Sequence, residues 1–167
     1  MYNLIIKSNS PENTLKIGES LATLLSKGDI AVLTGELGSG KTKFVEGFLQ
    51  NYNLQDEISS PTFNIVNEYV SEKNNIYHFD VYRLEDSDEF YAIGGEEYFE
   101  KGICLIEWGE MILDVLPKDY IHIKILKNPE DENLRTFEFE VNENSKYVEV
   151  LDKLKSIIQS SYDSHSS

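Results

Sequence analysis

Residues 34–43 read TGELGSGKTK, and their core is Gly35-Glu36-Leu37-Gly38-Ser39-Gly40-Lys41-Thr42. This is the phosphate-binding pattern of a glycine, four free positions and then Gly-Lys-Ser/Thr. The apolar run DIAVLT at residues 29–34 precedes it, and an amphipathic stretch follows, with one side formed by Phe44, Val45, Phe48, Leu49 and Tyr52. A strand, a glycine-rich loop and a helix in this order predict a P-loop for a nucleoside triphosphate.

The residue types in the loop suit the binding of phosphate groups. Gly35, Gly38 and Gly40 can adopt backbone angles closed to other residues, so successive N–H groups can point inward as an anion nest. The start of the following helix adds its positive end. Lys41 supplies a charge toward the β- and γ-phosphates, and the Thr42 hydroxyl can coordinate Mg²⁺. The alternative is a glycine-rich turn with an incidental lysine.

The pattern does not identify the base of the nucleotide. The chain contains no Asn-Lys-x-Asp stretch of the kind that reads guanine, which favours ATP.

The composition is that of a soluble globular protein, with 167 residues, 40% of them hydrophobic and 27% charged. The formal net charge of −15 disfavours broad contact with a nucleic-acid backbone, so we expect no DNA binding. No apolar run is long enough to span a bilayer, and the N-terminus does not resemble a secretory signal. These features predict a cytoplasmic protein without a membrane partner. The single cysteine, Cys104, is expected to be a buried apolar residue.

The rest of the chain alternates strand-like and helix-like segments. Helices are expected from Ser10-Pro11-Glu12 onward, after the glycine-rich loop, within residues 85–101, and around Tyr147, Leu151, Leu154 and Ile158. Strands are expected at residues 2–6, 29–34, 63–70, 76–82, 103–106, 120–126 and 135–141, with a turn at 128–133. We therefore predict an α/β fold: a single P-loop NTPase-like domain over residues 1–159, with a mixed parallel and antiparallel sheet flanked by helices. Residues 160–167 are expected to be a disordered tail.

Two acidic residues follow apolar strands and are candidates for the metal site. Asp80 ends the run at residues 76–79, and Glu107 ends the run at residues 103–106. Carboxylates at the carboxyl ends of strands lie where open α/β sheets bind ligands, and a P-loop site needs an acid near its metal. Glu107 is the stronger candidate, because an apolar run ending in an acid is the usual form of the second nucleotide motif. For each acid the alternative is a solvated carboxylate at a strand end.

Three further features are open to more than one interpretation. The turn Ser59-Ser60-Pro61-Thr62-Phe63 could sense a γ-phosphate through Thr62, or it could be an ordinary turn before a strand. His78 is interpreted as a packed histidine rather than a general base. Trp108 could stack on a ring or fill the core.

Four ordered blocks together resemble the bacterial TsaE (YjeE) family, the small ATPases of tRNA threonylcarbamoyladenosine biosynthesis. The resemblance covers about residues 1–141, and its blocks are residues 35–42, Ser60-Pro61-Thr62-Phe63, His78-Phe79-Asp80-Val81-Tyr82-Arg83-Leu84 and Ile103-Cys104-Leu105-Ile106-Glu107-Trp108. It implies a slow, Mg²⁺-dependent ATPase that supports partners like TsaD and TsaB. These partners modify the adenosine beside the anticodon in tRNAs reading codons that begin with A, so this chain would meet tRNA through the complex.

The resemblance also implies roles for individual residues. Lys41, Asp80 and Glu107 would serve catalysis, and Thr42, Glu107 and Asp80 would lie at Mg²⁺. The nucleotide would be bound by residues from five parts of the chain: Thr14, Gly35, Glu36, Leu37, Gly38, Ser39, Gly40, Lys41, Thr42, Thr62, Trp108 and Arg135. The sequence departs from the family pattern at Glu36, where Asp is commoner, and at Lys43, where a second Thr is common. Neither departure removes a phosphate or metal contact.

Two other functions use the same loop. A small-molecule kinase would need an arginine-rich lid, and the chain has only Arg83 and Arg135. A nucleotide-dependent assembly switch would need binding but no hydrolysis, and it would use the same residues.

Overall fold

One mixed sheet of seven strands organises the chain. The computed structural model describes residues 1–36, 38–58 and 65–165, with side chains described as far as residue 161. The strand order is β1-β7-β6-β2-β5-β4-β3. The strands are β1 (Tyr2–Ser8), β2 (Ile30–Gly35), β3 (Val66–Tyr69), β4 (Ile76–Asp80), β5 (Ile103–Glu107), β6 (Ile121–Asn128) and β7 (Asp131–Val141).

The centre of the sheet is parallel and its margins are antiparallel. β2 pairs in parallel with β5 and β6, and β5 pairs in parallel with β4. β1 with β7, β6 with β7, and β3 with β4 are antiparallel pairs. The sheet is therefore mixed, which confirms the predicted fold class. β2 and β5 are nearly continuous apolar runs because both of their faces are covered.

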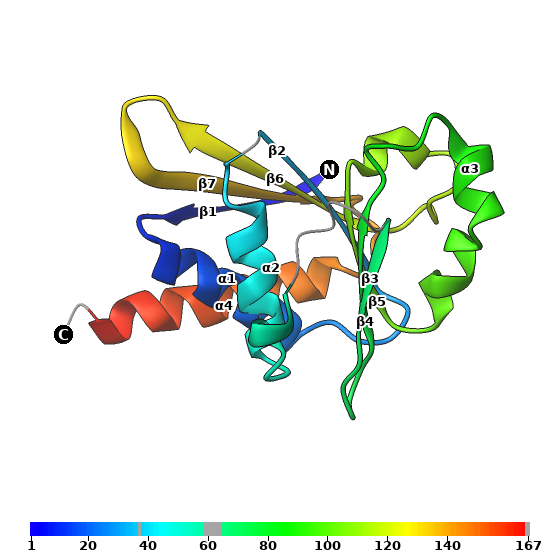
Figure 1. Ribbon diagram of the computed structural model, residues 1–167. Coiled ribbons are helices and arrows are strands. Elements are labelled where there is room, and N and C mark those ends of the chain that lie inside the picture. Colours follow the sequence, from blue (N-terminus) through cyan, green and yellow to red (C-terminus); the bar gives the residue numbers. More distant parts are fainter. Residues whose placement is uncertain (37, 59–64, 166–167) are drawn as a thin grey trace.

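Helices cover the two faces of the sheet unequally. The helices α1 (Pro11–Ala22), α2 (Lys41–Gln50) and α4 (Val148–His165) lie together on one side, and α3 (Ser87–Ala92) lies beyond the other face (Figure 1). Three short 3₁₀ helices complete the helical elements of the described residues: η1 (Gln55–Glu57), η2 (Gly95–Glu100) and η3 (Gly109–Ile112). One apolar core lies beneath α1, α2 and α4, and a smaller one lies beneath α3, η2 and η3.

The start of α1 follows the expected pattern. The Ser10 hydroxyl accepts a hydrogen bond from the Asn13 backbone N–H, and Pro11 occupies the first turn. Among the described residues, no helix is long and apolar enough to cross a membrane.

Two segments differ from the sequence-based prediction. α4 extends to His165, so residues 160–165 belong to this helix rather than to a disordered tail. A helix already held by the packing of Leu151, Leu154 and Ile158 can add further turns at little cost. The β6–β7 hairpin is also longer than expected, because Asn128 pairs with Asp131 where a broad turn was predicted. Its outer part is polar and solvent-exposed on both sides, so it lacks the alternation that marks a half-buried strand.

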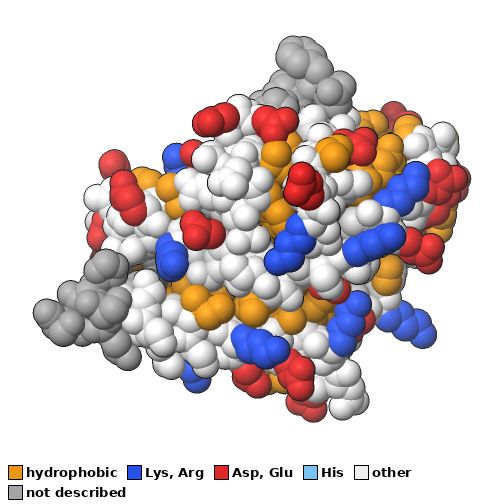
Figure 2. Space-filling view, turned by 90° about the horizontal axis from the view of Figure 1, so that it is seen from below, with side chains coloured by type: hydrophobic (Ala, Val, Ile, Leu, Met, Phe, Trp, Pro, Cys, Tyr) orange, Lys and Arg blue, Asp and Glu red, His pale blue; other side chains and the backbone are white. Residues whose placement is uncertain are grey.

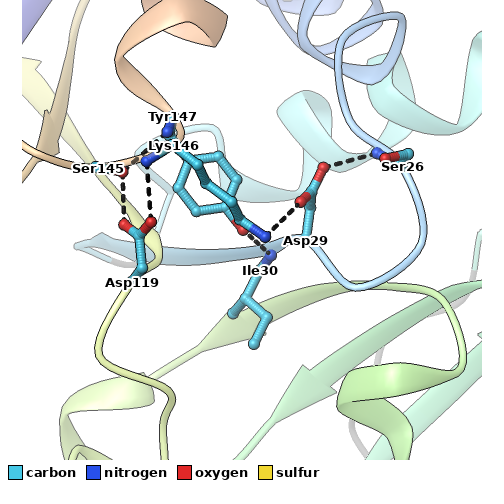
Figure 3. Close-up of polar contacts among 7 residues, drawn as sticks. All are labelled: Ser26, Asp29, Ile30, Asp119, Ser145, Lys146 and Tyr147. Carbon is cyan, nitrogen blue, oxygen red and sulfur yellow. Dashed lines mark hydrogen bonds and ion pairs between the residues drawn. The ribbon is translucent and has the colours of Figure 1, made fainter.

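The start of β2 is tied to the start of α4 by polar contacts (Figure 3). The buried Tyr147 hydroxyl accepts a hydrogen bond of 3.0 Å from the backbone N–H of Ile30. Beside it, the Lys146 ammonium lies 3.3 Å from Asp29 Oδ1, and Asp29 Oδ2 accepts a hydrogen bond from Ser26 N. Burial raises the pKa of Tyr147 well above its usual value, so the hydroxyl stays neutral. Tyr147, the residue before α4, therefore provides an acceptor for this backbone donor at the start of β2.

Replacement of Tyr147 by Phe should lower the free energy of unfolding by about 1–3 kcal/mol, because the buried Ile30 N–H loses its acceptor. Urea denaturation followed by circular dichroism measures this loss. Tyr91→Phe is the matched control at an exposed position and should change stability by no more than about 0.5 kcal/mol. Equal stabilities for the two variants would contradict this role of Tyr147.

Candidate nucleotide-binding site

The glycine-rich loop joins the end of β2 to the start of α2. Gly40 is the N-cap of α2 with φ 109°, and Gly38 has φ 79°, so both occupy the left-handed region that favours glycine. A Cβ on Gly35 would lie 2.7 Å from both the Ile125 carbonyl oxygen and Ser39 Oγ. The positive φ angles thus explain the glycines at positions 38 and 40, and the close approach of neighbouring atoms explains Gly35. Leu37 lies outside the described residues.

Lys41 is the centre of the site. Its ammonium donates a hydrogen bond of 2.9 Å to the Gly35 carbonyl and lies 3.7 Å from Glu107 Oε1. It also lies 5.1 Å from the centre of the Trp108 ring, within range of a cation–π interaction. The sequence assigned all three residues to the nucleotide site, and the fold brings Lys41, Glu107 and Trp108 together.

Trp108 is an exposed aromatic residue rather than part of the core. It is 36% exposed, and its ring centre lies 4.9 Å from that of Tyr82. Its φ of 63° is unusual for a bulky residue. Gly109 follows it so closely against β2 that a Cβ there would meet Val32 Cγ1 at 2.7 Å. The structure therefore rules out a core-filling role and leaves Trp108 at the edge of the site.

Glu107 is a buried carboxylate with two partners. Its Oε2 lies 2.6 Å from His78 Nε2, and its Oε1 faces Lys41. Burial by itself raises the pKa of Glu107, but the hydrogen bond to His78 and the charges of His78 and Lys41 outweigh this effect, so the pKa is lowered. The carboxylate is therefore ionised at neutral pH.

Asp80 lies beside Glu107 at the same edge of the sheet. The two residues are register partners in the parallel β4–β5 pair. Asp80 Oδ1 accepts a hydrogen bond of 3.1 Å from the Tyr82 backbone N–H, which fixes the turn after β4. Leu33 of β2 pairs with Glu107 from the other side, so Glu107 stands next to the strand that leads into the loop and Asp80 lies one strand further away.

These residues fit a magnesium ion held together with phosphate groups. Magnesium is usually bound by one or two carboxylates, substrate phosphates and water rather than by an all-protein cage. Glu107 directs one oxygen toward Lys41, and Thr42 is the second residue of α2. Within the described part of the chain, no three His, Cys, Asp or Glu side chains gather into a metal-binding group. The candidate protein ligands of a metal ion at this position would be Thr42, Glu107 and Asp80, with phosphate oxygens and water completing the set.

A cavity of about 240 Å³ opens beside the loop, between the start of α1 and the β6–β7 hairpin. It is lined by residues from α1, the loop and the hairpin: Ser10, Pro11, Thr14, Gly40, Lys43, Glu132, Asn133 and Arg135. Thr14 and Arg135 therefore both line the cavity beside the loop, and their binding of a nucleotide stays a prediction. The Thr14 hydroxyl is buried and paired with Ser8 Oγ at 2.8 Å, so Thr14 forms a wall of the cavity.

Arg135 supports the loop directly. Its Nε donates a hydrogen bond of 2.9 Å to the Ser39 carbonyl, and one terminal nitrogen lies 3.5 Å from the Gly38 carbonyl. From the same hairpin, the Lys127 ammonium lies 3.2 Å from the place where a Cβ of Gly38 would stand. Lys127 was not predicted, because the length of the hairpin that carries it is not visible in the sequence.

His78 is the other residue whose role the sequence did not reveal. It is packed, as predicted, but it is packed against the principal acid of the site. Glu36 is exposed at the loop, and its carbonyl accepts a hydrogen bond from Ser39 N. The proposed sensor Thr62 lies outside the described residues, so its role stays a prediction.

Comparison with known proteins identifies the chain's relatives. Residues 8–137 match the sequence model of the family described as "Threonylcarbamoyl adenosine biosynthesis protein TsaE". The tRNA threonylcarbamoyladenosine biosynthesis protein TsaE of Bacillus subtilis is 38% identical over 138 residues, which cover 82% of this chain and 86% of that protein. The protein of the same name from Treponema pallidum is 39% identical, covering 71% of this chain and 87% of its own. The crystal structure of Bacillus subtilis YdiB superposes with a TM-score of 0.74 at 30% identity, covering 93% of this chain and 95% of that one.

Replacement of Gly35 by Ala should destabilise the protein by about 1–3 kcal/mol, because the added methyl group meets the Ile125 backbone. It should also abolish nucleotide affinity, measured by calorimetry. Gly28→Ala is the control: Gly28 has φ 96° with nothing within 4 Å of an added Cβ, so it incurs only backbone strain of about 1–2 kcal/mol. Unchanged nucleotide affinity in Gly35→Ala would contradict the assignment of the loop.

Proposed function

The chain belongs to the TsaE family and so takes part in tRNA threonylcarbamoyladenosine biosynthesis, and from this premise we propose that it is a slow, Mg²⁺-dependent ATPase. In this proposal it supports TsaD-like and TsaB-like partners, which modify the adenosine next to the anticodon in tRNAs reading codons that begin with A. The observation that carries the proposal is the juxtaposition of Lys41 on the glycine-rich loop with the buried, ionised Glu107.

The backbone and side chains of the loop would hold the triphosphate. The N–H groups at the start of α2 and the positive end of that helix attract anions. Lys41 would exchange its hydrogen bond with the Gly35 carbonyl for phosphate oxygens, since a neutral carbonyl is a weaker partner than a charged phosphate. Thr42 and Glu107 would hold the metal ion, which neutralises charge on the phosphates when it is bound. Asp80 would orient the attacking water from the neighbouring strand end.

The cavity beside the loop would accept the base and ribose of the nucleotide. It adjoins Gly40, is closed on one side by Thr14, and carries polar side chains on the hairpin. Lys43, which departs from the family pattern, lines this cavity and forms an ion pair of 2.9 Å with Glu46. The residue that differs from the family pattern, Lys43, is therefore on the wall of the cavity, and the difference does not alter Lys41 or Thr42.

Contact with tRNA is proposed to occur through the partner proteins. The chain carries 30 acidic and 15 basic residues. On the face shown in Figure 2, acidic and basic side chains are interspersed, with apolar side chains visible between them. A nucleic-acid backbone binds best to a clustered basic surface, so a mixed surface on an acidic chain favours an indirect role.

An assembly switch without required hydrolysis is the second candidate. It is favoured by the contact of Lys41 with Trp108, because movement of Lys41 toward phosphates would change an exposed aromatic surface. A small-molecule kinase is disfavoured, since Arg135 is engaged with the loop backbone and leaves only Arg83 for an arginine lid.

Reconstitution with TsaD-like and TsaB-like proteins, unmodified tRNA and threonylcarbamoyl adenylate tests the proposal. Multiple turnover, followed by mass spectrometry of digested tRNA, should require both this protein and ATP. Lys41→Ala and Glu107→Ala should reduce turnover at least about 100-fold, because the first removes a positive charge that stabilises the transition state and the second removes a proposed ligand of the metal ion. Lys153→Ala, at an exposed position on α4, is the control and should behave as the unmodified protein. Modification at equal rates without the protein would reject its supporting role.

Asp80→Asn separates the ATPase from the assembly switch. The substitution keeps the size of the side chain and an oxygen that can accept the Tyr82 N–H hydrogen bond, but it removes the charge. If hydrolysis is required, tRNA modification should stop at one turnover while ATP still binds. Full multiple turnover by an Asp80→Asn protein that no longer hydrolyses ATP would favour the switch.

A further inference from the structure

His78 is a buried polar residue beneath the candidate metal site. It lies on β4 and is 2% exposed. Its Nε2 lies 2.6 Å from Glu107 Oε2, a short distance even for a hydrogen bond to a charged group. Among the described residues, Nδ1 has no hydrogen-bond partner and is itself buried. A ring nitrogen without a partner is costly in the interior, so the hydrogen bond to Glu107 is the polar interaction that accounts for a histidine here.

The register of the sheet explains the geometry of this pair. His78 pairs with Leu105 and Asp80 pairs with Glu107 across the parallel β4–β5 contact. Side chains alternate across a strand, so His78, Asp80, Leu105 and Glu107 point to the same face. The His78 ring lies on β4 two residues before Asp80, the register partner of Glu107. It therefore reaches Glu107 diagonally across the pair of strands.

The two oxygens of Glu107 are therefore used differently. Oε2 points inward and is held by His78, while Oε1 points toward Lys41. Lys41 cannot fix the carboxylate by itself, because its distance is 3.7 Å and it also bonds to the Gly35 carbonyl. The short contact with a rigid, fully buried ring sets the orientation of the whole carboxylate.

We propose that His78 is a positioning residue: its Nε2–H holds Oε2 of Glu107 so that Oε1 faces the metal ion of the bound nucleotide. This inference rests on the proposed function, since it assigns Glu107 to that metal. Hydrogen bonds to metal-binding side chains fix their orientation, and loss of such a partner typically lowers metal affinity by about 10–100-fold.

Two amides separate positioning from packing. In His78→Gln the side-chain nitrogen can reach the place of Nε2 and still donate to Glu107. In His78→Asn the nitrogen corresponds to Nδ1 and stops short of the carboxylate. Both variants lose the imidazole ring, and the smaller Asn leaves the larger cavity, so a packing role predicts weaker analogue binding without metal as well as weaker Mn²⁺ binding.

The measurement is Mn²⁺ binding by electron paramagnetic resonance, with a non-hydrolysable ATP analogue present. His78→Asn should weaken Mn²⁺ binding by about 10-fold or more, and His78→Gln should retain most of the affinity. Affinity for the analogue in EDTA should be the same in all three proteins, because the loop is unchanged. Equal Mn²⁺ affinities for the two variants, whether high or low, would overturn the positioning role.

A second test uses the unmodified protein, so it does not depend on whether a His78 variant folds. With ¹⁵N-labelled histidine, the Nε2 proton of His78 should be observed by NMR, and its shift should move when Mg²⁺ is added to the analogue complex. A shift that responds to the analogue but not to Mg²⁺ would overturn the proposal. Failure of the unmodified protein to bind the analogue at all would instead reject the proposed function, and this inference with it.

Discussion

The parallel pairing of β2 with β5 is the constraint on which the rest of the site depends. It sets Leu33 opposite Glu107, so the final residues of β2, which lead into the glycine-rich loop, stand beside the buried acid. β4 then adds Asp80 in register with Glu107 on the far side of β5. A slip of one residue in either pairing would turn an acid to the opposite face of the sheet. The apolar side chains of β2 and β5, buried on both faces, hold this register.

A charged group at this depth has to be compensated. Removing a carboxylate from water is unfavourable, and Glu107 stays ionised because His78 and Lys41 oppose that effect. The two partners differ in one respect that matters for the proposed function. His78 is held in the core, whereas Lys41 belongs to the loop and would turn toward phosphates. The permanent partner then keeps the carboxylate oriented while the other partner moves.

The sequence predicted the parts of this structure that depend on local patterns. The loop, its flanking strand and helix, and the apolar runs of β2 and β5 are all continuous in the chain, and they were enough to predict the fold class. Pairings between distant residues were not readable. The contact of His78 with Glu107 depends on sheet register, and the approach of Lys127 and Arg135 to the loop depends on the length of a polar hairpin. The end of α4 was missed because residues 160–165 are mostly small or polar, and the helix continues through them from the packed turns that precede them.

Trp108 connects the nucleotide site to the molecular surface. A bulky residue with positive φ costs about 1–3 kcal/mol, which the surrounding structure must supply. The close packing of Gly109 on Val32 fixes the backbone immediately after Trp108, and the indole contacts both Lys41 and Tyr82. Lys41 thus contacts both the Glu107 carboxylate and the exposed Trp108 ring. If phosphates draw Lys41 away, both contacts change together, so one lysine would couple occupancy of the site to this exposed aromatic surface.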